Sequence, residues 1–437
     1  MKHIKDKCVG CGKNRKLKPN KLCICCNSKQ TKCISCNRKV KLKYENNKLC
    51  TDCYHARQIL NINSGNHDID NLIKATHNKQ LKHRLEWIPF NDFVVIKHIG
   101  SGGFSEVFTA TWTKGTLNGF KNRNKNVTVV LKVLKDSSNI NSTFLKELQN
   151  IVESQPNSDK RKLVQCYGVS QDLNTNNYIF VMSYMPHGSL NEYLSNDFKN
   201  ITWQMKISML MSIVKGIKWI HKNKIIHRDI HSGNILINKV NDPVIADLGF
   251  SRPANEDPKS SEIYGIMPYV APEVFRTQQY SFSSDIYSLG MIMWELTSGR
   301  RPFCDRAYDV DLALSICIGL RPEITEDTPL FWAILMQKCW RAEPLERPST
   351  WEIHSEVISS YWNFDNIFIE TEDKRQELLK SGKFVAKHMH PHSKTHSKSL
   401  NSTIDSLLST LHRSFGFSIS GSVNFFQNIG SDSFNIM

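Results

Sequence analysis

The 437-residue sequence lacks any apolar run near the roughly 20 residues that a membrane-spanning helix requires. It begins with the polar stretch MKHIKDKC and has no apolar leader there. Acidic residues are few, with 41 Asp and Glu against 57 Lys and Arg, which gives a net charge of +16. Cysteine is scarce after residue 53, because nine of the 13 cysteines lie before residue 54. The lack of a long apolar run and of an apolar leader predicts an intracellular, cytoplasmic protein without a transmembrane segment, and a nuclear location is left open.

The first 58 residues contain four C-x2-C pairs in two similar halves, CVGCGKNRKLKPNKLCICC and CISCNRKVKLKYENNKLCTDC. Four thiolates at this spacing suit tetrahedral zinc, and a bound metal stabilises a short segment that cannot build a hydrophobic core. Disulfides are the alternative, but cysteine clusters in intracellular proteins are more often metal-bound. The sequence therefore predicts a tandem zinc-ribbon-like module over residues 1–58. Its predicted ligands are Cys8, Cys11, Cys23 and Cys26 for one zinc, and Cys33, Cys36, Cys50 and Cys53 for the other.

This predicted zinc module is strongly basic. Residues 1–60 hold 16 Lys and Arg against three Asp and Glu. Such a surface suits nucleic acid or an anionic membrane, yet Tyr44 and Tyr54 are the only aromatic residues available for stacking on bases. A solvated basic face that docks a protein partner is the other interpretation, and both stay open.

A glycine-rich turn lies between two β-like runs, FVVIKHI and EVFTATW. Glycines let the backbone approach phosphate oxygens without a side chain in the way. The turn predicts a phosphate-binding loop formed by Ile99, Gly100, Ser101, Gly102, Gly103, Phe104, Ser105, Glu106 and Val107.

The next apolar run, VTVVLKVL, contains Lys132, which is costly to bury unless it is paired. Glu147 is the expected partner. It shares one face of a predicted helix over 142–154 with Phe144 and Ile151, and this face points the carboxylate inward.

Three polar residues follow in the stretches HRDIHSGN and DLG. Asp229 is followed by Asn234 five residues later, and Asp247 lies downstream. This layout is a known signature of phosphoryl transfer, in which one Asp accepts the proton of an attacking hydroxyl while Asn and the second Asp hold magnesium. Farther on, Glu273 in the triplet APE is expected to pair with a buried Arg347.

Taken in this order, the features resemble the eukaryotic protein kinase superfamily over residues 87–362. The resemblance is strongest to the tyrosine-kinase-like group, in particular a large fungal set with EWIPFNDF before the glycine loop. It implies an α+β, bilobal fold, with an antiparallel sheet and one helix in the first lobe and a helical second lobe. It also implies ATP in the cleft between the lobes and protein substrates.

The resemblance also assigns roles to residues. Lys132 anchors phosphates, Glu147 holds Lys132, and Asp229 acts as catalytic base. Asn234 and Asp247 bind magnesium. The remaining nucleotide contacts are assigned to Val130, the gatekeeper Met182, the hinge residues Tyr184 and Met185, and Leu236.

Five positions depart from the kinase pattern. Ser105 replaces the third glycine and Leu248 replaces the usual Phe after the metal-binding Asp, and both are expected to fit. Val130 stands where a small Ala normally meets adenine, so crowding of about 1–3 kcal/mol is expected there. His231 and Ile266 replace the lysine and threonine typical of serine/threonine kinases without supplying the residues typical of tyrosine kinases.

None of these changes removes a charge that the chemistry needs, so an active kinase is expected. Serine/threonine acceptors are the habit of the group, and tyrosine or dual specificity stays open. The alternative is a pseudokinase scaffold that acts through its zinc module. Ser260, Ser261 and Tyr264 are candidate regulatory phosphorylation sites whose phosphate would pair with Arg228.

The flanks of the kinase-like region are polar. Residues 59–86 are predicted to form a linker with a short helix in it, and residues 363–437 a helical or disordered tail. A leucine-rich stripe in the tail recurs at helical spacing and is expected to pack on the kinase-like region or on a partner. The stripe comprises Leu400, Ile404, Leu407, Leu408, Leu411 and Phe415, and it follows a histidine tract of His388, His390, His392 and His396.

Overall fold

The structure, a computed structural model, describes residues 30–32, 39–41, 64–78, 84–118, 122–138, 142–154, 162–239, 241–254, 262–362, 367–382, 389–393 and 396–415. Of the predicted zinc module it describes only a short antiparallel pair, β1 (Gln30–Lys32) and β2 (Lys39–Lys41). The predicted zinc ligands Cys8, Cys11, Cys23, Cys26, Cys33, Cys36, Cys50 and Cys53 all lie outside the described residues.

The first part of the fold is a six-stranded sheet with the order β3-β9-β10-β8-β5-β4. Its strands are antiparallel except at one edge, where β3 runs parallel to β9. The expected sheet was wholly antiparallel; β3 adds one parallel edge strand before the glycine-rich turn. The strands are β3 (Glu86–Trp87), β4 (Phe93–Ser101), β5 (Ser105–Trp112), β8 (Val127–Leu134), β9 (Cys166–Gln171) and β10 (Tyr178–Ser183), and a small hairpin of β6 (Thr116–Asn118) and β7 (Asn122–Asn124) follows β5.

Two helices belong to this part, α3 (His67–Asn78) and α4 (Ser142–Ser154). Helix α4 covers the predicted range 142–154, and its Phe144 and Leu148 are fully buried. Helix α3 lies in the predicted linker 59–86, but its Ile69 and Ile73 are fully buried in the same apolar cluster. The linker prediction missed this packing because the spacing of apolar residues in α3 is helical although its overall composition is polar.

The second part is mostly helical and surrounds a large apolar core. Helix α6 (Trp203–Lys222) begins at a Thr202 cap, and α8 (Phe282–Ser298) begins at a Ser281 cap and ends at Gly299 in the left-handed conformation. The other helices are α5 (Leu190–Asp197), α7 (Pro272–Thr277), α9 (Val310–Cys317), α10 (Leu330–Cys339) and α11 (Thr350–Trp362), and short strand pairs join β11 (Ile225–Ile226) to β14 (Arg252–Pro253) and β12 (Ile235–Lys239) to β13 (Asp242–Ile245).

The tail packs on this helical part. Helix α12 (Ile367–Lys380) places the carboxylate of Glu372 on the backbone N–H of Trp203, the first residue of α6. Helix α13 (Asn401–Phe415) follows strand β16 (Lys398–Ser399), which pairs with β15 (Tyr264–Gly265). Leu400, Ile404 and Leu407 are fully buried in the core of the helical part, so of the two expected packing surfaces they use the kinase-like region. The side chains of Leu411 and Phe415 lie outside the described residues.

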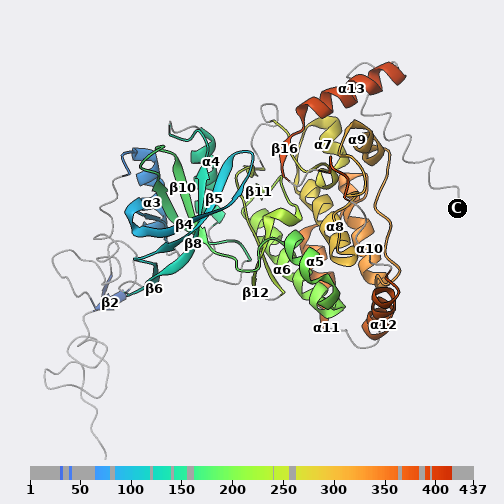
Figure 1. Ribbon diagram of the computed structural model, residues 1–437, viewed down its shortest axis with the longest axis horizontal. Coiled ribbons are helices and arrows are strands. Elements are labelled where there is room, and N and C mark those ends of the chain that lie inside the picture. The colour runs from blue at the N-terminus through green and yellow to red at the C-terminus, as the bar shows by residue number, and fades with distance from the viewer. Residues whose placement is uncertain are drawn as a thin grey trace, which may run out of the picture.

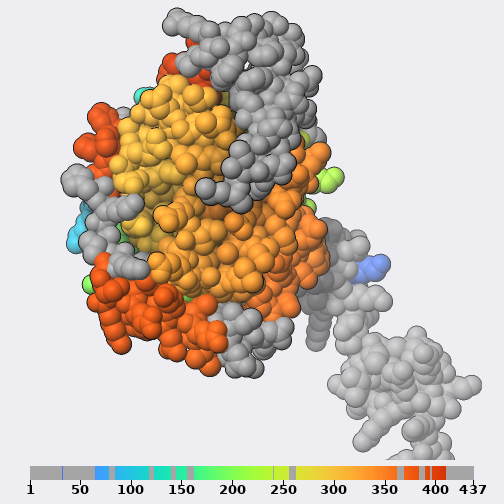
Figure 2. Space-filling view, turned by 90° about the vertical axis from the view of Figure 1, so that its right-hand side faces the viewer, coloured from blue at the N-terminus to red at the C-terminus, as the bar shows by residue number. Residues whose placement is uncertain are grey.

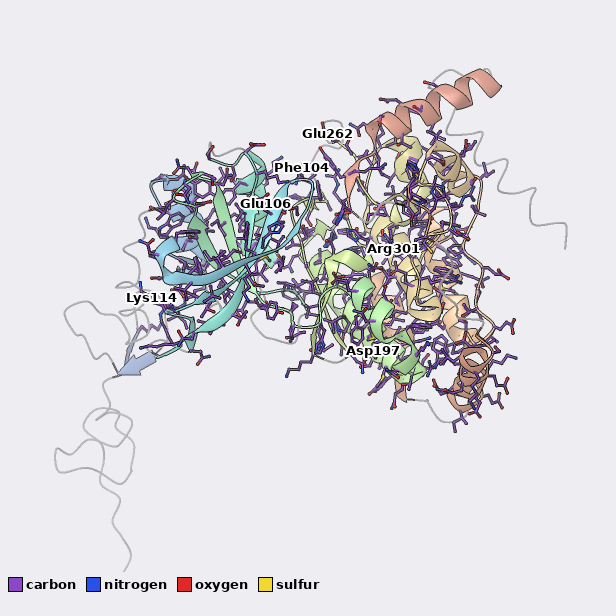
Figure 3. The ribbon with its side chains drawn as sticks, in the orientation of Figure 1. Phe104, Glu106, Lys114, Asp197, Glu262 and Arg301 are labelled. Atoms are coloured by element: carbon purple, nitrogen blue, oxygen red, sulfur yellow. The ribbon has the colours of Figure 1, made fainter. Side chains whose placement is uncertain are left out.

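The arrangement is therefore α+β, with an antiparallel sheet followed by a mostly helical part, and the two lie side by side in Figure 1. Figure 2 views the molecule from the helical end, whose face is formed largely by the yellow and orange residues of that part. Figure 3 labels Phe104, at the tip of the β4–β5 turn, and Glu262 from the helical part, and both residues line the same cavity. Within the described ranges, no helix is long and apolar enough to cross a membrane.

Candidate active site

A cavity of about 1310 Å³ lies between the β4–β5 turn and the helical part. The predicted glycine-loop residues line it with the exception of Glu106, and the turn is closed by a 2.8 Å bond from the N–H of Gly102 to the carbonyl of Ser105. Of the other predicted nucleotide contacts, Val130, Lys132, Tyr184, Met185 and Leu236 line the cavity. Met182 is not among the described lining residues and packs instead with the apolar cluster behind α4.

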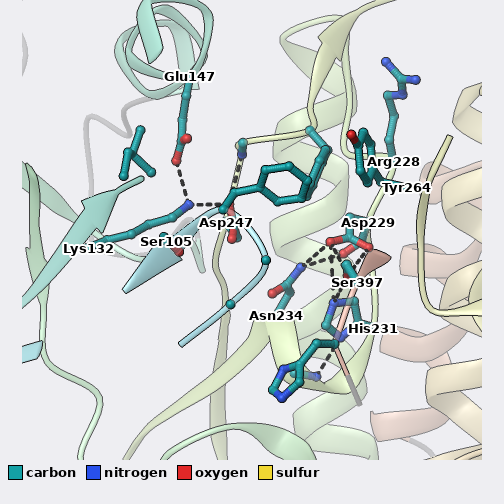
Figure 4. Close-up of a pocket in the computed structure, with 18 of the residues that line it drawn as sticks. Ser105, Lys132, Glu147, Arg228, Asp229, His231, Asn234, Asp247, Tyr264 and Ser397 are labelled. Atoms are coloured by element: carbon teal, nitrogen blue, oxygen red, sulfur yellow. Dashed lines mark hydrogen bonds and ion pairs between the residues drawn. The ribbon is translucent and has the colours of Figure 1, made fainter. Parts of the chain in front are cut away.

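Lys132 lies on the cavity wall and joins two carboxylates (Figure 4). Its Nζ donates to Glu147 Oε1 and to Asp247 Oδ1, each at 2.8 Å, so the predicted Lys132–Glu147 pair is present. Burial lowers the pKa of Lys132, but Asp247 and Glu147 outweigh burial and raise it above its usual value. Burial also raises the pKa of Asp247, and the Lys132 ammonium reverses this and lowers it. Lys132 is thus held as a cation beside an ionised Asp247.

Glu147 is placed by the packing of α4 on the sheet. Phe144, one turn earlier, stacks on Tyr178 and Phe180 with ring centroids 4.8 and 5.1 Å away. At the other end of α4, Asn150 Nδ2 donates to the carbonyl of Ser251 at 2.8 Å. These contacts fix α4 against both the sheet and the segment after Asp247. Burial raises the pKa of Glu147, and the attraction of Lys132 opposes that rise.

Leu248 follows Asp247 and packs against both the core of the helical part and the apolar cluster beneath α4. The prediction that leucine fits in place of phenylalanine is confirmed.

Asp285 holds the loop that carries Asp229. Its carboxylate, 1 % exposed, accepts the backbone N–H groups of His227 and Arg228 at 2.8 and 3.0 Å. Arg228 has a φ of 72°, a conformation that residues with side chains rarely adopt. The two bonds to a buried carboxylate over-determine this strained turn and fix the position of the next residue, Asp229.

Asp229 and Asn234 form one unit at the floor of the cavity. The Nδ2 of Asn234 donates to the backbone carbonyl of Asp229 at 2.9 Å and to its Oδ2 at 3.1 Å. The nitrogen end of the amide is therefore committed to Asp229, which leaves the oxygen end for a cation.

His231, where serine/threonine kinases carry lysine, is buried beside Asp229 with its Nε2 3.6 Å from Oδ2. Its Nδ1 accepts the backbone N–H of Gly233 at 3.0 Å. A neutral ring bound in this way carries its proton on Nε2, the nitrogen that faces the cavity floor.

Ser397 is a site residue that the sequence analysis missed. Its Oγ lies 2.8 Å from both carboxylate oxygens of Asp229 and 3.1 Å from Nε2 of His231 (Figure 4). It lies 168 residues from Asp229 along the chain, in a tract of histidine, serine and lysine without a recognisable motif.

The segment between Asp247 and Glu273 is described only in part, since Ser260 and Ser261 lie outside the described residues. Tyr264 stacks on Phe250 at 4.8 Å and meets Phe104 of the glycine loop edge-on at 5.0 Å. Burial and the carboxylate of Glu262 raise the pKa of Tyr264 to about 12. The guanidinium of Arg228, the predicted partner of a phosphate here, lies 4.4 Å over the ring of Tyr280.

In the histidine tract, His388 lies outside the described residues. Among the residues that the structure does describe, no group of three or more His, Cys, Asp or Glu side chains is arranged to hold a metal ion.

A glycine-rich turn over a Lys–Glu pair, with an Asp–Asn unit opposite, defines a protein of the kinase class. Residues 93–357, more than half of the chain, match the profile of the family described as protein tyrosine and serine/threonine kinase. The chain therefore belongs to this family.

The curated relatives include serine/threonine-protein kinases and a tyrosine-protein kinase. A probable serine/threonine-protein kinase of Dictyostelium discoideum is 32% identical over 294 residues, which cover 63% of this chain and 16% of that protein. A putative serine/threonine-protein kinase/receptor of Acanthamoeba polyphaga mimivirus is 30% identical over 64% of this chain and 16% of its own length. The tyrosine-protein kinase FRK of Homo sapiens is 30% identical over 64% of this chain and 55% of its own length. The chain thus spans about a sixth of the length of the first two relatives.

Proposed function

We propose that this protein is a kinase that transfers the γ-phosphate of ATP to serine or threonine hydroxyls of protein substrates, with tyrosine as the secondary class of acceptor. Within the family, we assign it to the tyrosine-kinase-like group with a bilobal fold. One observation carries the proposal. Lys132, Glu147 and Asp247 are already joined on one wall of the cavity, while Asp229 and Asn234 meet on its floor. All five lie on the lining of one cavity large enough for a nucleotide.

The residues fit the roles that a kinase requires. Lys132, held as a cation, supplies positive charge for the phosphates, and Glu147 fixes its position. Asp229 accepts the proton of the attacking hydroxyl, and the bonds of Asp285 to His227 and Arg228 hold its loop in place. His231 directs an N–H toward the same spot and takes the place of the absent lysine as a hydrogen-bond donor.

Magnesium suits the donor set of Asn234 and Asp247, an amide oxygen and a carboxylate that Lys132 keeps ionised. When bound there, the cation neutralises charge on the phosphates and orients them.

The test is turnover of γ-labelled ATP by the purified chain on a generic protein substrate, beside Asp229→Ala. Label that vanishes in the variant supports the kinase, and phosphoamino-acid analysis of the product decides between serine/threonine and tyrosine. Absence of label in both, together with no nucleotide binding, would favour the pseudokinase scaffold.

We also propose that residues 1–58 bind two structural zinc ions through Cys8, Cys11, Cys23 and Cys26, and through Cys33, Cys36, Cys50 and Cys53. Zinc ligation would require reduced thiolates, which suits an intracellular setting, and the basic charge of this region suits a protein partner or nucleic acid. Metal analysis of the purified chain tests the zinc, with two equivalents expected. A salt titration separates the partners, because binding through nucleic-acid phosphates must weaken steeply as salt rises.

A further inference from the structure

The hydroxyl of Ser397 is hydrogen-bonded to the carboxylate of Asp229. Its Oγ is 2.8 Å from both oxygens of Asp229, the group proposed as catalytic base. The distance suits a hydrogen bond between a hydroxyl and a carboxylate. A general base must lie within this reach of the proton that it accepts.

The hydrogen bonds around Ser397 are consistent in direction. Nδ1 of His231 accepts a hydrogen bond from the backbone N–H of Gly233, so its Nε2–H donates toward Oγ of Ser397 at 3.1 Å. The hydroxyl hydrogen of Ser397 is then committed to Asp229. The lone pair left on Oγ makes this oxygen a nucleophile once Asp229 takes the proton.

The backbone around Ser397 is held as an added strand. Lys398 and Ser399 pair antiparallel with Gly265 and Tyr264. The N–H of Leu400 donates to the carbonyl of Ile263 at 2.8 Å. Strand addition of this kind is a common way to bind an extended peptide, because backbone bonds give affinity whatever the sequence.

Two anchors flank this strand. On its C-terminal side, Leu400, Ile404 and Leu407 are fully buried in the core of the helical part. On its N-terminal side, the N–H of His390 donates to the carbonyl of Cys304 at 2.9 Å. The segment is thus seated by buried apolar surface as well as by backbone bonds, and Ser397 is fixed between the two anchors.

The glycine loop reaches the same point from the other side. A methyl group placed on Gly103 would lie 3.8 Å from the backbone carbonyl of Ser397. Ser397 and its neighbour His396 line the cavity together with Lys132 and Asp247. A nucleotide whose phosphates lie under the glycine loop would present its γ-phosphate to this hydroxyl.

We propose that Ser397 is an intramolecular phosphoacceptor, and that its segment occupies the protein-substrate site until it is phosphorylated. The inference rests on the proposed kinase function. Oγ of Ser397 forms a bond to the γ-phosphorus of ATP, and the bond from this phosphorus to the bridging oxygen of the β-phosphate breaks. The proton passes to Asp229 and then to solvent, so ATP and serine give ADP, phosphoserine and one proton.

Phosphorylated Ser397 fits beside Asp229 less well than unphosphorylated Ser397. A phosphate on Ser397 carries close to two negative charges and lies against the carboxylate of Asp229, at present 2.8 Å from Oγ. Like charges at this distance repel, so β16 leaves β15 and the site opens to other proteins.

The first experiment follows label on the peptide that contains Ser397. Full-length, phosphatase-treated protein receives γ-labelled ATP and magnesium over a wide range of protein concentrations. The rate constant is expected to be independent of concentration, and an Asp229→Ala chain added to the mixture should stay unlabelled at Ser397. Ser397→Ala should lose this label, while Ser399→Ala, an exposed serine two residues away, should keep it. Absence of label on Ser397, or a rate proportional to concentration, overturns the proposal.

The second experiment measures the KM for an added serine-containing protein. A tethered segment acts at a local concentration of about 1 mM, so undocking it should lower this KM about tenfold. Leu400→Asp with Ile404→Asp removes the anchor, and Asn401→Ala is a milder variant that removes a 3.0 Å bond to the N–H of Ile263. Preincubation with ATP should lower the KM for wild type but not for Ser397→Ala.

The failure of this inference can be distinguished from the failure of the proposed kinase function. An added substrate phosphorylated with one unchanged KM in all variants, and no label on Ser397, would overturn this inference and leave the kinase function standing. No Asp229-dependent label on any acceptor would overturn the kinase function itself.

Discussion

The guanidinium of Arg347 donates two hydrogen bonds of 2.7 Å to the carboxylate of Glu273, which lies 74 residues earlier in the sequence. Both side chains are buried, and Arg347 also donates to the carbonyl of Ser283 at 2.9 Å. The pair that was predicted from sequence is therefore present, and it joins α7 to the segment before α11.

We expect Arg347→Lys to lower the free energy of unfolding by about 3 kcal/mol, because lysine keeps the charge but cannot bind both oxygens of a buried carboxylate. Urea denaturation measures this. The matched control is Arg341→Lys, whose exposed pair with Glu346 spans 3.6 Å. Its change should stay within about 0.5 kcal/mol. Equal effects of the two substitutions would contradict the assignment.

Glu147→Gln should reduce kcat/KM about 100-fold, since the Lys132 ammonium would lose the carboxylate that fixes its position against the phosphates. Lys132 would keep its bond to Asp247, so thermal stability should fall much less than activity. Glu153→Gln changes the same helix at an exposed carboxylate that accepts from Gln149 at 2.9 Å, and it should leave kinetics unchanged. An active Glu147→Gln would show that the ion pair is not needed for transfer.

Val130→Ala should lower the KM for ATP about tenfold by removing two methyl groups from the cavity wall where adenine is expected. Val133→Ala serves as control, because it removes the same two methyl groups from the same strand at a residue that packs in the apolar cluster on the other face of the sheet. Steady-state kinetics measure the KM for ATP, and nucleotide titration measures ATP binding directly. A KM for ATP that rises in Val130→Ala would mean that Val130 supports the nucleotide instead of crowding it.

Glu295 should make stability depend on pH. Burial raises its pKa to about 8 in the folded protein, from 4.5 in the unfolded chain, while it accepts a 3.1 Å bond from Ser232. Between these values the folded state holds a proton that the unfolded state lacks, so unfolding releases a proton and stability falls as pH rises. Compared with Glu295→Gln, the wild type should lose about 1.4 kcal/mol per pH unit between roughly pH 5 and 7.5. A difference that stays constant with pH would contradict the buried, protonated carboxyl.

The central site could be predicted from sequence because its residues lie in short, fixed patterns. Asp229 and Asn234 are five residues apart in one loop, and their relation follows from that spacing. Predicting the Lys132–Glu147 pair required only that one strand and one amphipathic helix pack together. The apolar periodicity of residues 142–154 indicated that helix.

Other features depend on contacts that no local pattern encodes. Ser397 reaches Asp229 through the docking of α13, and the leucine-rich stripe predicted a buried face without indicating where it packs. A short helix was expected in the segment that forms α3, but its docking on α4 was not, because its buried face combines Ile69 and Ile73 with the polar residues Thr76 and His77. Met182 was expected to contact the nucleotide, but its side chain packs with the apolar cluster behind α4. The pairing of β10 with β9 shifts register between Val181 and Met182.

Helix α3 packs directly on α4, the helix that contributes Glu147 to the candidate active site. Helix α3 is the first described helix after the cysteine-rich region, and its buried face packs against the helix that carries Glu147. A displacement of α3 would therefore act on the helix whose Glu147 carboxylate holds Lys132.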